Sequence, residues 1–375
     1  MTEDDPLVDT IVADRYRIIR KIGEGGMSVV FEAQHIKLAR AFALKGLLPH
    51  LCDNEEVVQR FEREAELLGS LRHPNIVDIS DWCTLPDGSP CMVLEFLHGA
   101  ALIVRMHRAQ LPWDGILRVA EQSMSALALA HRLGITHRDL KPENIFISID
   151  DVGEERVKLL DFGISKLRGV NRLSGVHKML GTPSYMSPEQ AQGLTDQIGP
   201  TTDCWAMGAI LYEMATQRVA FRGETLMDTL TQIISKPPDP MNLYRRDVPP
   251  AFQELIDCTL TTDDSKRIQS IEEMRDRLRL ALDPRTISRV STPVIGVPRP
   301  APMELRPLAA PPLLTPGPKP QPPKTPLPGE LTAVRPQTPV SLEASPASGG
   351  RRWMVIMLVV LILVGLGNVA IALLL

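Results

Sequence analysis

The fold is decided by the stretch Ile135-Thr136-His137-Arg138-Asp139-Leu140-Lys141-Pro142-Glu143-Asn144, which runs into the apolar segment Ile145-Phe146-Ile147. Positions 137–144 hold a carboxylate base, two cations and an amide. A second apolar segment then leads into Asp161-Phe162-Gly163. An aspartate and an asparagine that converge at a strand end form a hard-oxygen site suited to Mg²⁺, which keeps water ligands and binds substrate phosphates. Taken alone, the first stretch could equally be a satisfied polar turn.

A turn rich in glycine, Gly23-Glu24-Gly25-Gly26-Met27-Ser28, joins two apolar strands nearer the N-terminus. Because glycine has no Cβ, the backbone N–H groups of such a turn can approach a phosphate closely. A glycine-rich turn is nevertheless more often only a hairpin turn, so by itself it decides nothing. The apolar residues that flank it are Tyr16, Ile18, Ile22, Val29, Val30 and Phe31.

Lys45 closes the next apolar strand, after Ala43 and Leu44. A lone lysine at a strand end is usually a solvated surface residue. Glu64 changes that expectation, because it lies beside the apolar stripe of a predicted helix. A buried charge without a partner is costly. The sequence therefore predicts an ion pair between Lys45 and Glu64.

The helix that carries Glu64 is predicted from its caps and its apolar periodicity. Asp53 or Asn54 can cap its N-terminus, and His73-Pro74 is expected to end it. Glu62 and Glu66 are expected to face water. The apolar positions that recur at helical spacing are Val57, Val58, Phe61, Ala65, Leu68 and Leu71.

Composition excludes several classes of protein. The chain has 375 residues, with 41 Lys+Arg against 45 Asp+Glu and a formal net charge of −4, which argues against a protein that coats nucleic acid. Hydrophobic residues make up 44%, enough for a core. The five scattered cysteines indicate reduced thiols in a cytosolic compartment and neither a disulfide framework nor a zinc site. The acidic N-terminus does not resemble a secretory signal peptide.

The C-terminal quarter differs from the rest. Of the 33 prolines, 18 lie in 284–350, which predicts a disordered linker with partial polyproline-II character. The apolar run Met354–Leu375 follows, and its 22 residues would span about 33 Å as a helix, against a hydrocarbon core of about 30 Å. Arg351 and Arg352 precede the run, so the positive-inside rule places the upstream chain in the cytoplasm. The sequence thus predicts a single-pass tail anchor in the cell inner (plasma) membrane.

The sequence as a whole resembles the eukaryotic-like (Hanks-type) serine/threonine protein kinases, most closely their bacterial branch. The resemblance covers about Tyr16 to Leu282. Besides the segments above, it is carried by His73-Pro74-Asn75-Ile76-Val77, Gly181-Thr182-Pro183-Ser184-Tyr185-Met186-Ser187-Pro188-Glu189, Asp203-Cys204-Trp205-Ala206-Met207-Gly208 and Arg267.

The resemblance implies a two-lobed α+β fold, with a small antiparallel-sheet N-lobe that carries one helix and a larger, mostly helical C-lobe. The predicted organisation begins with an acidic N-terminal segment over 1–15 and a kinase domain over 16–282. Within the kinase domain, the N-lobe covers about 16–97 and the C-lobe about 98–282. A Pro-rich juxtamembrane linker over 283–352 and a transmembrane helix over 353–375 follow.

The resemblance also assigns roles in ATP binding. Lys45 should hold the α- and β-phosphates while Glu64 fixes its direction, Leu94 should border the adenine pocket, and Glu95-Phe96-Leu97 should be the hinge that hydrogen-bonds the base. The full set implied to contact or position ATP is Ile22, Gly23, Glu24, Gly25, Gly26, Met27, Ser28, Val29, Val30, Ala43, Lys45, Glu64, Glu95 and Leu97.

Catalytic roles follow in the same way. Asp139 should accept the proton of the attacking hydroxyl, and Asn144 and Asp161 should bind Mg²⁺, with Mn²⁺ as an alternative ion. Lys141 indicates the serine/threonine class. Thr182 should line the substrate-binding loop, and Ser174 is the first choice for an autophosphorylation site. The residues implied to have structural roles are His137, Arg138, Gly163, Glu189, Asp203 and Arg267.

The chain departs from the family pattern at three positions, none of which removes a charged or metal-binding group. Ser28 stands for the third loop glycine, Ser187 stands for the alanine of the Ala-Pro-Glu motif, and Gly46 directly after Lys45 has no explanation in the sequence. A pseudokinase and a membrane-tethered interaction scaffold are the alternative functions. Protein substrates, ATP and the membrane are the expected partners, nucleic acid is not, and a kinase-domain homodimer is left open.

Overall fold

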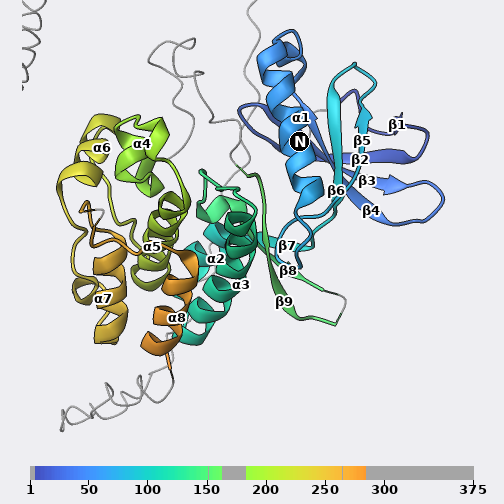
Figure 1. The fold of residues 1–375 in the computed structure, drawn as a ribbon. Coiled ribbons are helices and arrows are strands. Elements are labelled where there is room, and N and C mark those ends of the chain that lie inside the picture. The colour runs from blue at the N-terminus through green and yellow to red at the C-terminus, as the bar shows by residue number, and fades with distance from the viewer. Residues whose placement is uncertain (1–4, 151, 163–182, 264, 284–375) are drawn as a thin grey trace, which may run out of the picture. The chain divides into compact units, whose positions relative to one another are not determined.

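The computed structural model describes residues 5–150, 152–162, 183–263 and 265–283. The upstream lobe is built on a six-stranded antiparallel sheet with the order β1-β2-β3-β4-β6-β5 (Figure 1). Its first strand lies upstream of Tyr16, so the sheet extends into the predicted N-terminal segment. The strands are β1 (Ile11–Val12), β2 (Tyr16–Glu24), β3 (Ser28–His35), β4 (Ala41–Leu47), β5 (Ile79–Thr84) and β6 (Pro90–Glu95).

The period of two along these strands gives the sheet two different faces. One face buries Val29, Phe31 and Leu44 against Ile18 and Val93 in a core of its own. The other face carries the alternate residues of the same strands. There Val30 lies opposite Lys45, Lys45 opposite Met92 and Ala43 opposite Leu94.

Gly46 now has a physical explanation. It lies opposite Cys91 in the sheet, and a Cβ added at Gly46 would overlap the side chain of Leu85, which is buried. Glycine in a strand often marks a close approach of this kind.

A single long helix, α1 (Glu55–Ser70), packs beside the sheet (Figure 1). The side chain of Asn54 caps it by accepting hydrogen bonds from Glu56 N and Val57 N, which satisfies two of the free N–H groups of the first turn. The helix ends three residues before His73, earlier than predicted. Leu71 leaves the helix in an extended conformation and is 2% exposed, so burial of its side chain directs the chain away from the helix axis.

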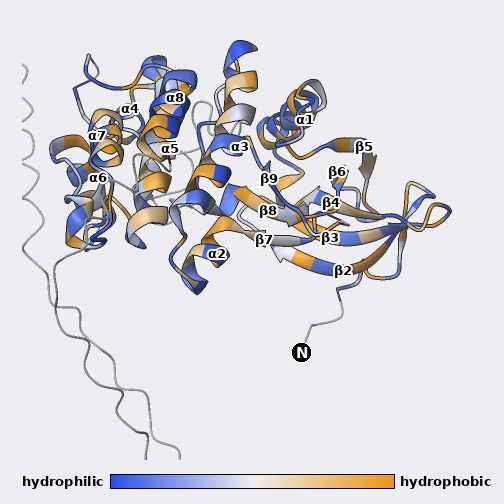
Figure 2. Cartoon of the chain, turned by 90° about the horizontal axis from the view of Figure 1, so that it is seen from below, coloured by the Kyte–Doolittle hydropathy of each residue, from blue (hydrophilic) through white to orange (hydrophobic). Residues whose placement is uncertain are grey.

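The downstream lobe is mostly helical and is centred on α5 (Pro200–Thr216). Almost every residue of α5 is buried, including Trp205 and Tyr212, because α3, α7 and α8 contact it. Figure 2 shows apolar residues along α5 and mixed colours along the outer helices and the strands. The helices of this lobe are α2 (Leu102–Arg108), α3 (Trp113–Arg132), α4 (Pro188–Ala191), α5, α6 (Leu226–Ser235), α7 (Pro250–Thr259) and α8 (Ile271–Ala281).

A small three-stranded sheet positions the polar residues of the stretch from Ile135 to Asn144. Its strands are β7 (Gly99–Ala101), β8 (Ile145–Ile149) and β9 (Glu155–Leu159), in that order. A 3-10 turn, Pro142–Asn144, leads from the polar stretch into β8. The chain leaves β9 just before Asp161. Because β8 and β9 are antiparallel neighbours, with Ile145 opposite Leu159, the start of one strand and the end of the other bring Asn144 and Asp161 to the same edge.

The predicted two-lobed α+β fold is confirmed, and β6 and β7 flank the predicted lobe boundary between 97 and 98. Within the described ranges, no helix is long and apolar enough to cross a membrane. The predictions for Gly163, Ser174, Thr182 and the segment 284–375, which includes most of the linker and the predicted anchor, lie outside the described residues.

Candidate active site

Lys45 of β4 joins the two lobes through a pair of carboxylates. Its Nζ donates to Glu64 Oε1 of α1 at 2.8 Å and to Asp161 Oδ1 at 2.6 Å. The side chains of Lys45 and Glu64 are 9% and 10% exposed, whereas that of Asp161 is 51% exposed. The predicted ion pair between Lys45 and Glu64 is confirmed, and Lys45 lies inside β4 rather than at its end.

The charges of this triad are coupled. Burial opposes the charged form of Lys45, but attraction to Asp161 and Glu64 outweighs it and raises the pKa of the lysine. Burial also disfavours the charged form of Asp161, but the Lys45 ammonium lowers the pKa of that carboxyl. The pKa of Glu64 is raised, chiefly by burial, with repulsion from Asp161 opposing the attraction of Lys45. Lys45 and Asp161 are therefore both charged at neutral pH.

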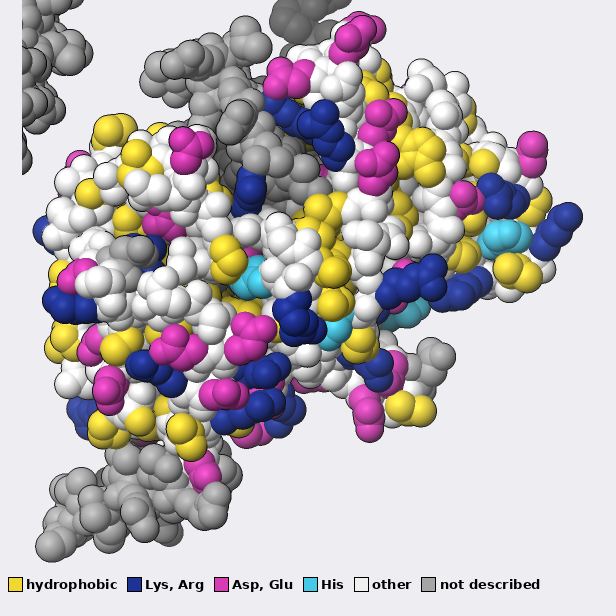
Figure 3. Space-filling view, viewed as in Figure 1, with side chains coloured by type: hydrophobic (Ala, Val, Ile, Leu, Met, Phe, Trp, Pro, Cys, Tyr) yellow, Lys and Arg dark blue, Asp and Glu magenta, His cyan; other side chains and the backbone are white. Residues whose placement is uncertain are grey.

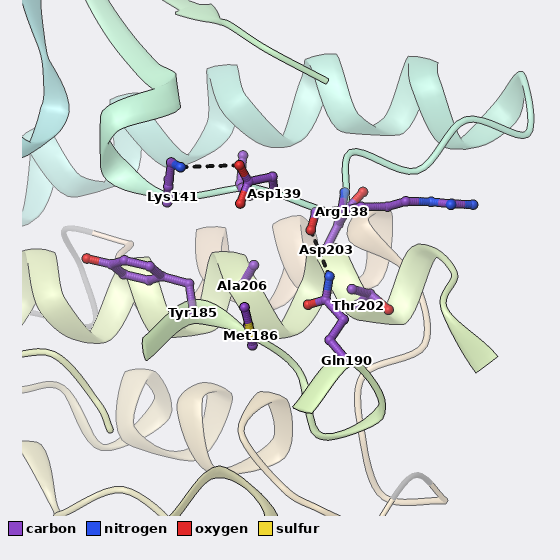
Figure 4. A pocket seen from close by; sticks show the side chains of 10 residues that line it. Arg138, Asp139, Lys141, Tyr185, Met186, Gln190, Thr202, Asp203 and Ala206 are labelled. Carbon is purple, nitrogen blue, oxygen red and sulfur yellow. Dashed lines mark hydrogen bonds and ion pairs between the residues drawn. The ribbon is translucent and has the colours of Figure 1, made fainter. Parts of the chain in front are cut away.

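Asp139 lies within a short loop whose side chains contact one another. Lys141 Nζ donates to Asp139 Oδ2 at 3.2 Å, and Asn144 Nδ2 donates to the Asp139 carbonyl at 2.8 Å. Because its amide nitrogen is engaged with the backbone, the Asn144 side chain directs its amide oxygen away from that carbonyl. Figure 4 shows Asp139 and Lys141 side by side at a pocket that Tyr185 and Met186 also line.

Buried polar groups hold the backbone of this loop in place. Asp203, at the start of α5, accepts hydrogen bonds from the backbone N–H groups of His137 and Arg138 at 2.8 and 2.9 Å, and its Oδ2 lies 2.7 Å from His131 Nε2. The His137 ring lies 4.7 Å from the Phe162 ring, centroid to centroid. Burial lowers the pKa of His137, which favours the neutral imidazole beside the loop.

Arg267 and Glu189 form a second buried ion pair, inside the helical lobe. Arg267 Nη1 donates to Glu189 Oε2 at 3.0 Å, and Thr202 Oγ1 donates to Glu189 Oε1 at 2.8 Å. The pairing that the resemblance implied is present. Ser187 also has a physical role, because its side chain caps α4 and forms a capping box with Gln190.

The glycine-rich turn joins β2 and β3 as predicted, with Gly25 N donating to Ser28 O at 2.8 Å. No described side chain or backbone atom lies within 4 Å of a Cβ built on Gly23, and a Cβ on Gly25 would make only an ordinary contact. The packing of the protein itself therefore does not require glycine at these positions. A ligand that must approach the backbone closely would require it.

The structure describes all the residues implied to contact ATP, and it contradicts one of them. Ile22, Val30 and Ala43 are exposed or partly exposed, whereas Val29 is 6% exposed within the core on the opposite face of the sheet. Assigning Val29 to the ATP site was wrong, because adjacent strand residues point to opposite faces. The same alternation in the sequence carried the signal.

The proposed hinge is braced by a contact that the sequence did not predict. Glu95 N donates to Asp78 O at 3.0 Å, while Asp78 N donates to Glu95 Oε1 at 2.8 Å. Lys158 of β9 also donates to Glu95 Oε1. The Glu95 side chain is therefore engaged inside the protein, and only its backbone carbonyl, with Leu97, remains a candidate for contact with the base.

The oxygen-bearing side chains of the site can be compared with the ligands that Mg²⁺ requires. No described cluster of three or more His, Cys, Asp or Glu side chains could hold a metal ion by itself. Asn144 and Asp161 supply two oxygen-bearing side chains, and Mg²⁺ is usually held by one or two carboxylates together with substrate phosphates and waters. The residues fit an ion that arrives with a phosphate ligand.

Charged side chains of both signs are interspersed over the face shown in Figure 3. This distribution agrees with the near-neutral balance of the chain.

Protein kinases use three recurring parts in phosphoryl transfer. They are a lysine–glutamate pair in the sheet lobe, an Asp-x-Lys-x-x-Asn loop, and a second aspartate near the lysine of the pair. The fold and the arrangement of the site are those of a two-lobed protein kinase domain. The protein kinase domain family matches residues 16–277. The chain belongs to the protein kinase family.

Proteins similar to this chain include bacterial serine/threonine kinases. The chain is 33% identical over 312 residues to the serine/threonine-protein kinase pkn3 of Myxococcus xanthus, covering 79% of this chain and 57% of that protein. It is 36% identical over 280 residues to Pkn1 of the same organism, covering 74% and 40%. It is 33% identical over 279 residues to PrkC of Bacillus subtilis (strain 168), covering 74% and 42%. The matches thus cover about half of these relatives' lengths.

Solved structures support the fold. The Mycobacterium tuberculosis PknI kinase domain matches with a TM-score of 0.57 and 24% identity, covering 73% of this chain and 98% of that one. Rad53 1-466 in complex with AMP-PNP matches with a TM-score of 0.57 and 26% identity, covering 70% and 64%.

Proposed function

We propose that this protein is a serine/threonine protein kinase that transfers the γ-phosphoryl group of ATP to serine or threonine hydroxyls of protein substrates. The observation that carries the proposal is the meeting of Lys45, Glu64 and Asp161 in one ion-pair network, beside the Asp139 loop. The serine/threonine kinases to which the chain is similar support it.

The roles of the residues follow from the charge that the reaction moves. Phosphoryl transfer needs alignment and charge neutralisation more than covalent help. Lys45 is charged and held in direction by Glu64, so it can bind the α- and β-phosphates. Asp139 accepts the proton of the attacking hydroxyl, and Lys141, 3.2 Å away, places a positive charge beside it.

Asn144 and Asp161 would hold Mg²⁺ together with the ATP phosphates. When bound, the ion supplies positive charge to the phosphate oxygens. Asp161 is suited to this role because its pKa is lowered and its side chain is half exposed. When ATP and the ion bind, the Lys45 ammonium can exchange its contact with Asp161 for the phosphates.

The proposal is tested with the detergent-solubilised full chain, [γ-³²P]ATP and Mg²⁺, beside the Asp139→Asn variant. We expect label on serine or threonine in the parent chain, none in the variant, and loss of labelling when EDTA removes the ion. Mn²⁺ is tested as the alternative ion. Full activity in pure Asp139→Asn protein would overturn the assignment of the base, and an unlabelled parent that still binds ATP would favour a pseudokinase.

Autophosphorylation on the activation segment is part of the proposal. The sequence places Ser174 next to an arginine-containing stretch, and Thr182 precedes Pro183. Arg138 precedes the base, and a phosphate on the segment could neutralise that arginine. Phosphopeptide mapping of the parent and of Ser174→Ala is the test. Phosphate found only at other residues would remove Ser174 from the proposal.

Membrane anchoring is supported by sequence composition alone. The 22-residue apolar run after Arg351-Arg352 has the length and flanking charges of a spanning helix. We expect the full chain to remain with membranes after alkaline carbonate extraction, and a chain that ends before Met354 to be released. Release of both would contradict the anchor.

A further inference from the structure

Gln190 of α4 makes a hydrogen bond that none of the roles above includes. Its Nε2 donates to the carbonyl oxygen of Arg138 at 2.7 Å, across 52 positions of sequence. Arg138 immediately precedes the proposed base Asp139. In Figure 4 a dashed line joins the Gln190 side chain to this carbonyl at the edge of the pocket.

The backbone that receives this bond is in an unusual conformation. Arg138 has φ = 64°, in the left-handed region that a residue with a side chain seldom adopts. Such a conformation persists when its surroundings over-determine it. Both backbone polar groups of Arg138 are held by side chains, because its N–H donates to Asp203 Oδ1 at 2.9 Å and its carbonyl accepts from Gln190.

The bond acts on the peptide unit that carries Asp139. The carbonyl of Arg138 and the N–H of Asp139 belong to one planar peptide group. The Asp139 N–H donates to the His137 carbonyl at 2.9 Å. The plane is therefore held at its oxygen end by Gln190 and at its nitrogen end by His137. Rotation of this plane would swing the Cα of Asp139 and with it the carboxylate.

The orientation of the Gln190 amide is fixed by its other end. Gln190 Oε1 accepts from the backbone N–H of Ser187 at 3.1 Å within the capping box of α4. With its oxygen in the cap, the amide must present its nitrogen to Arg138. The helix that carries Gln190 is anchored in turn, because the neighbouring Glu189 pairs with Arg267.

We propose that Gln190 is a positioning residue that holds the Arg138–Asp139 peptide plane so that the Asp139 carboxylate faces the acceptor hydroxyl. The inference rests on the proposed kinase function. It connects the segment that carries Tyr185 and Met186, at the pocket beside Asp139, to the backbone of the base itself.

Gln190→Glu is the informative variant. A glutamate has nearly the same shape and keeps an oxygen to accept from Ser187 N, so the cap is preserved. It replaces the donor with an oxygen that faces the Arg138 carbonyl. Gln190→Met is the second variant, because it removes the donor without adding a charge. Ser187→Ala is the matched control, since it weakens the cap and leaves the Nε2 donor in place.

Initial rates are measured with the full chain and a generic protein substrate, with Lys45→Met as the blank. We expect kcat to fall about 10- to 100-fold in both Gln190 variants, because small displacements of a catalytic group can cost that much. KM for ATP should change by less than about twofold, since the proposed ATP contacts are on other elements. Ser187→Ala should keep its kcat while its melting temperature falls. A kcat equal to that of the parent in both Gln190 variants would overturn the inference.

Hydrogen exchange provides a readout that does not depend on activity. The Asp139 amide should exchange faster in Gln190→Glu and Gln190→Met than in the parent, while amides in α8 exchange unchanged. Unchanged exchange at Asp139 would overturn the positioning role. A parent without phosphoryl transfer whose Asp139 amide still responds to Gln190 would refute the proposed function and support the positioning of the loop.

Discussion

The molecule contains one buried ion pair at the proposed ATP site and another inside the helical lobe. The two pairs differ in the partners that surround their charged groups. Lys45 and Glu64 are 9% and 10% exposed, and Arg267 and Glu189 are 3% and 7% exposed. Lys45 has a second carboxylate partner, Asp161, which is half exposed. Arg267 instead donates to the Thr261 carbonyl at 3.1 Å, and its guanidinium lies 5.2 Å from the centre of the Trp205 ring.

The pKa values of the two glutamates are shifted in opposite directions. Burial disfavours the charged form of Glu189, but hydrogen bonds from its own backbone amide, Ser187 and Thr202, with the charge of Arg267, outweigh it and hold the pKa of this carboxyl below its ordinary value. The pKa of Glu64 is raised, chiefly by burial. The Glu189 pair is thus organised to stabilise the fold. The Lys45 network keeps a cation partly available to a ligand at some cost in stability, as functional sites often do.

The largest effect is expected at the first pair, on activity. Lys45→Met removes the proposed phosphate cation, so the rate of phosphoryl transfer should fall about 100- to 1000-fold or more. Glu64 and Asp161 lose their shared partner, but Asp161 is open to solvent and Glu64 can take up a proton. The fold should therefore persist with native circular dichroism. A variant that transfers phosphate at the parental rate would refute the role of Lys45.

The largest effect on stability is expected at the second pair. Arg267→Met leaves Glu189 buried without its cation, and breaking a buried pair in this way costs about 3–5 kcal/mol. Urea unfolding followed by tryptophan fluorescence measures the loss. Thr202→Val is the matched control, because it removes one hydrogen bond to the same carboxylate and one from the Gly199 N–H but leaves the ion pair, and it should cost only about 1–2 kcal/mol. Equal losses in both variants would show that the ion pair adds little.

The pH dependence of stability should separate the two glutamates. Because the folded pKa of Glu189 is below its ordinary value of 4.5, its contribution is fully present above about pH 4.5 and is lost as the pH falls through the folded value. The stability difference between the parent and Glu189→Gln should therefore shrink below about pH 4.5. A difference that stays constant down to pH 3 would contradict the lowered pKa.

The same comparison shows what a sequence can and cannot predict. The pairing of Lys45 with Glu64 was predictable, because apolar periodicity placed one glutamate beside the buried stripe and desolvation requires a partner for it. Burial of Val29 is also predictable, because strand alternation places it on the face opposite to Val30. The need for glycine at position 46 depends on the approach of the Leu85 side chain, which has no local signature in the sequence.

Side-chain contacts between distant segments were not predictable. The bond from Gln190 to the Arg138 carbonyl and that from Lys158 to Glu95 join residues 52 and 63 positions apart. One of these acceptors is a backbone atom, which every residue possesses, so residue type carries no information about it. Such contacts become visible only when the fold places the elements together.

Glu64→Gln gives the smallest expected change in stability and the sharpest contrast with Glu189→Gln. When Glu64 loses its charge, Lys45 keeps Asp161 as a partner at 2.6 Å, so no buried charge is left alone. Because the folded pKa of Glu64 is raised, its charged form lowers the stability of the parent above that pKa, and glutamine removes this penalty. The free energy of unfolding at pH 7 should therefore change by less than about 1 kcal/mol, or rise slightly.

Activity should nevertheless fall in Glu64→Gln, because Lys45 would remain drawn toward Asp161 and away from the phosphates. Urea unfolding and initial rates on the same preparation measure both quantities. A stability loss as large as that of Glu189→Gln would mean that the Lys45 network holds the lobes together as a structural pair does. Retained activity with unchanged stability would mean that Lys45 needs no glutamate to direct it.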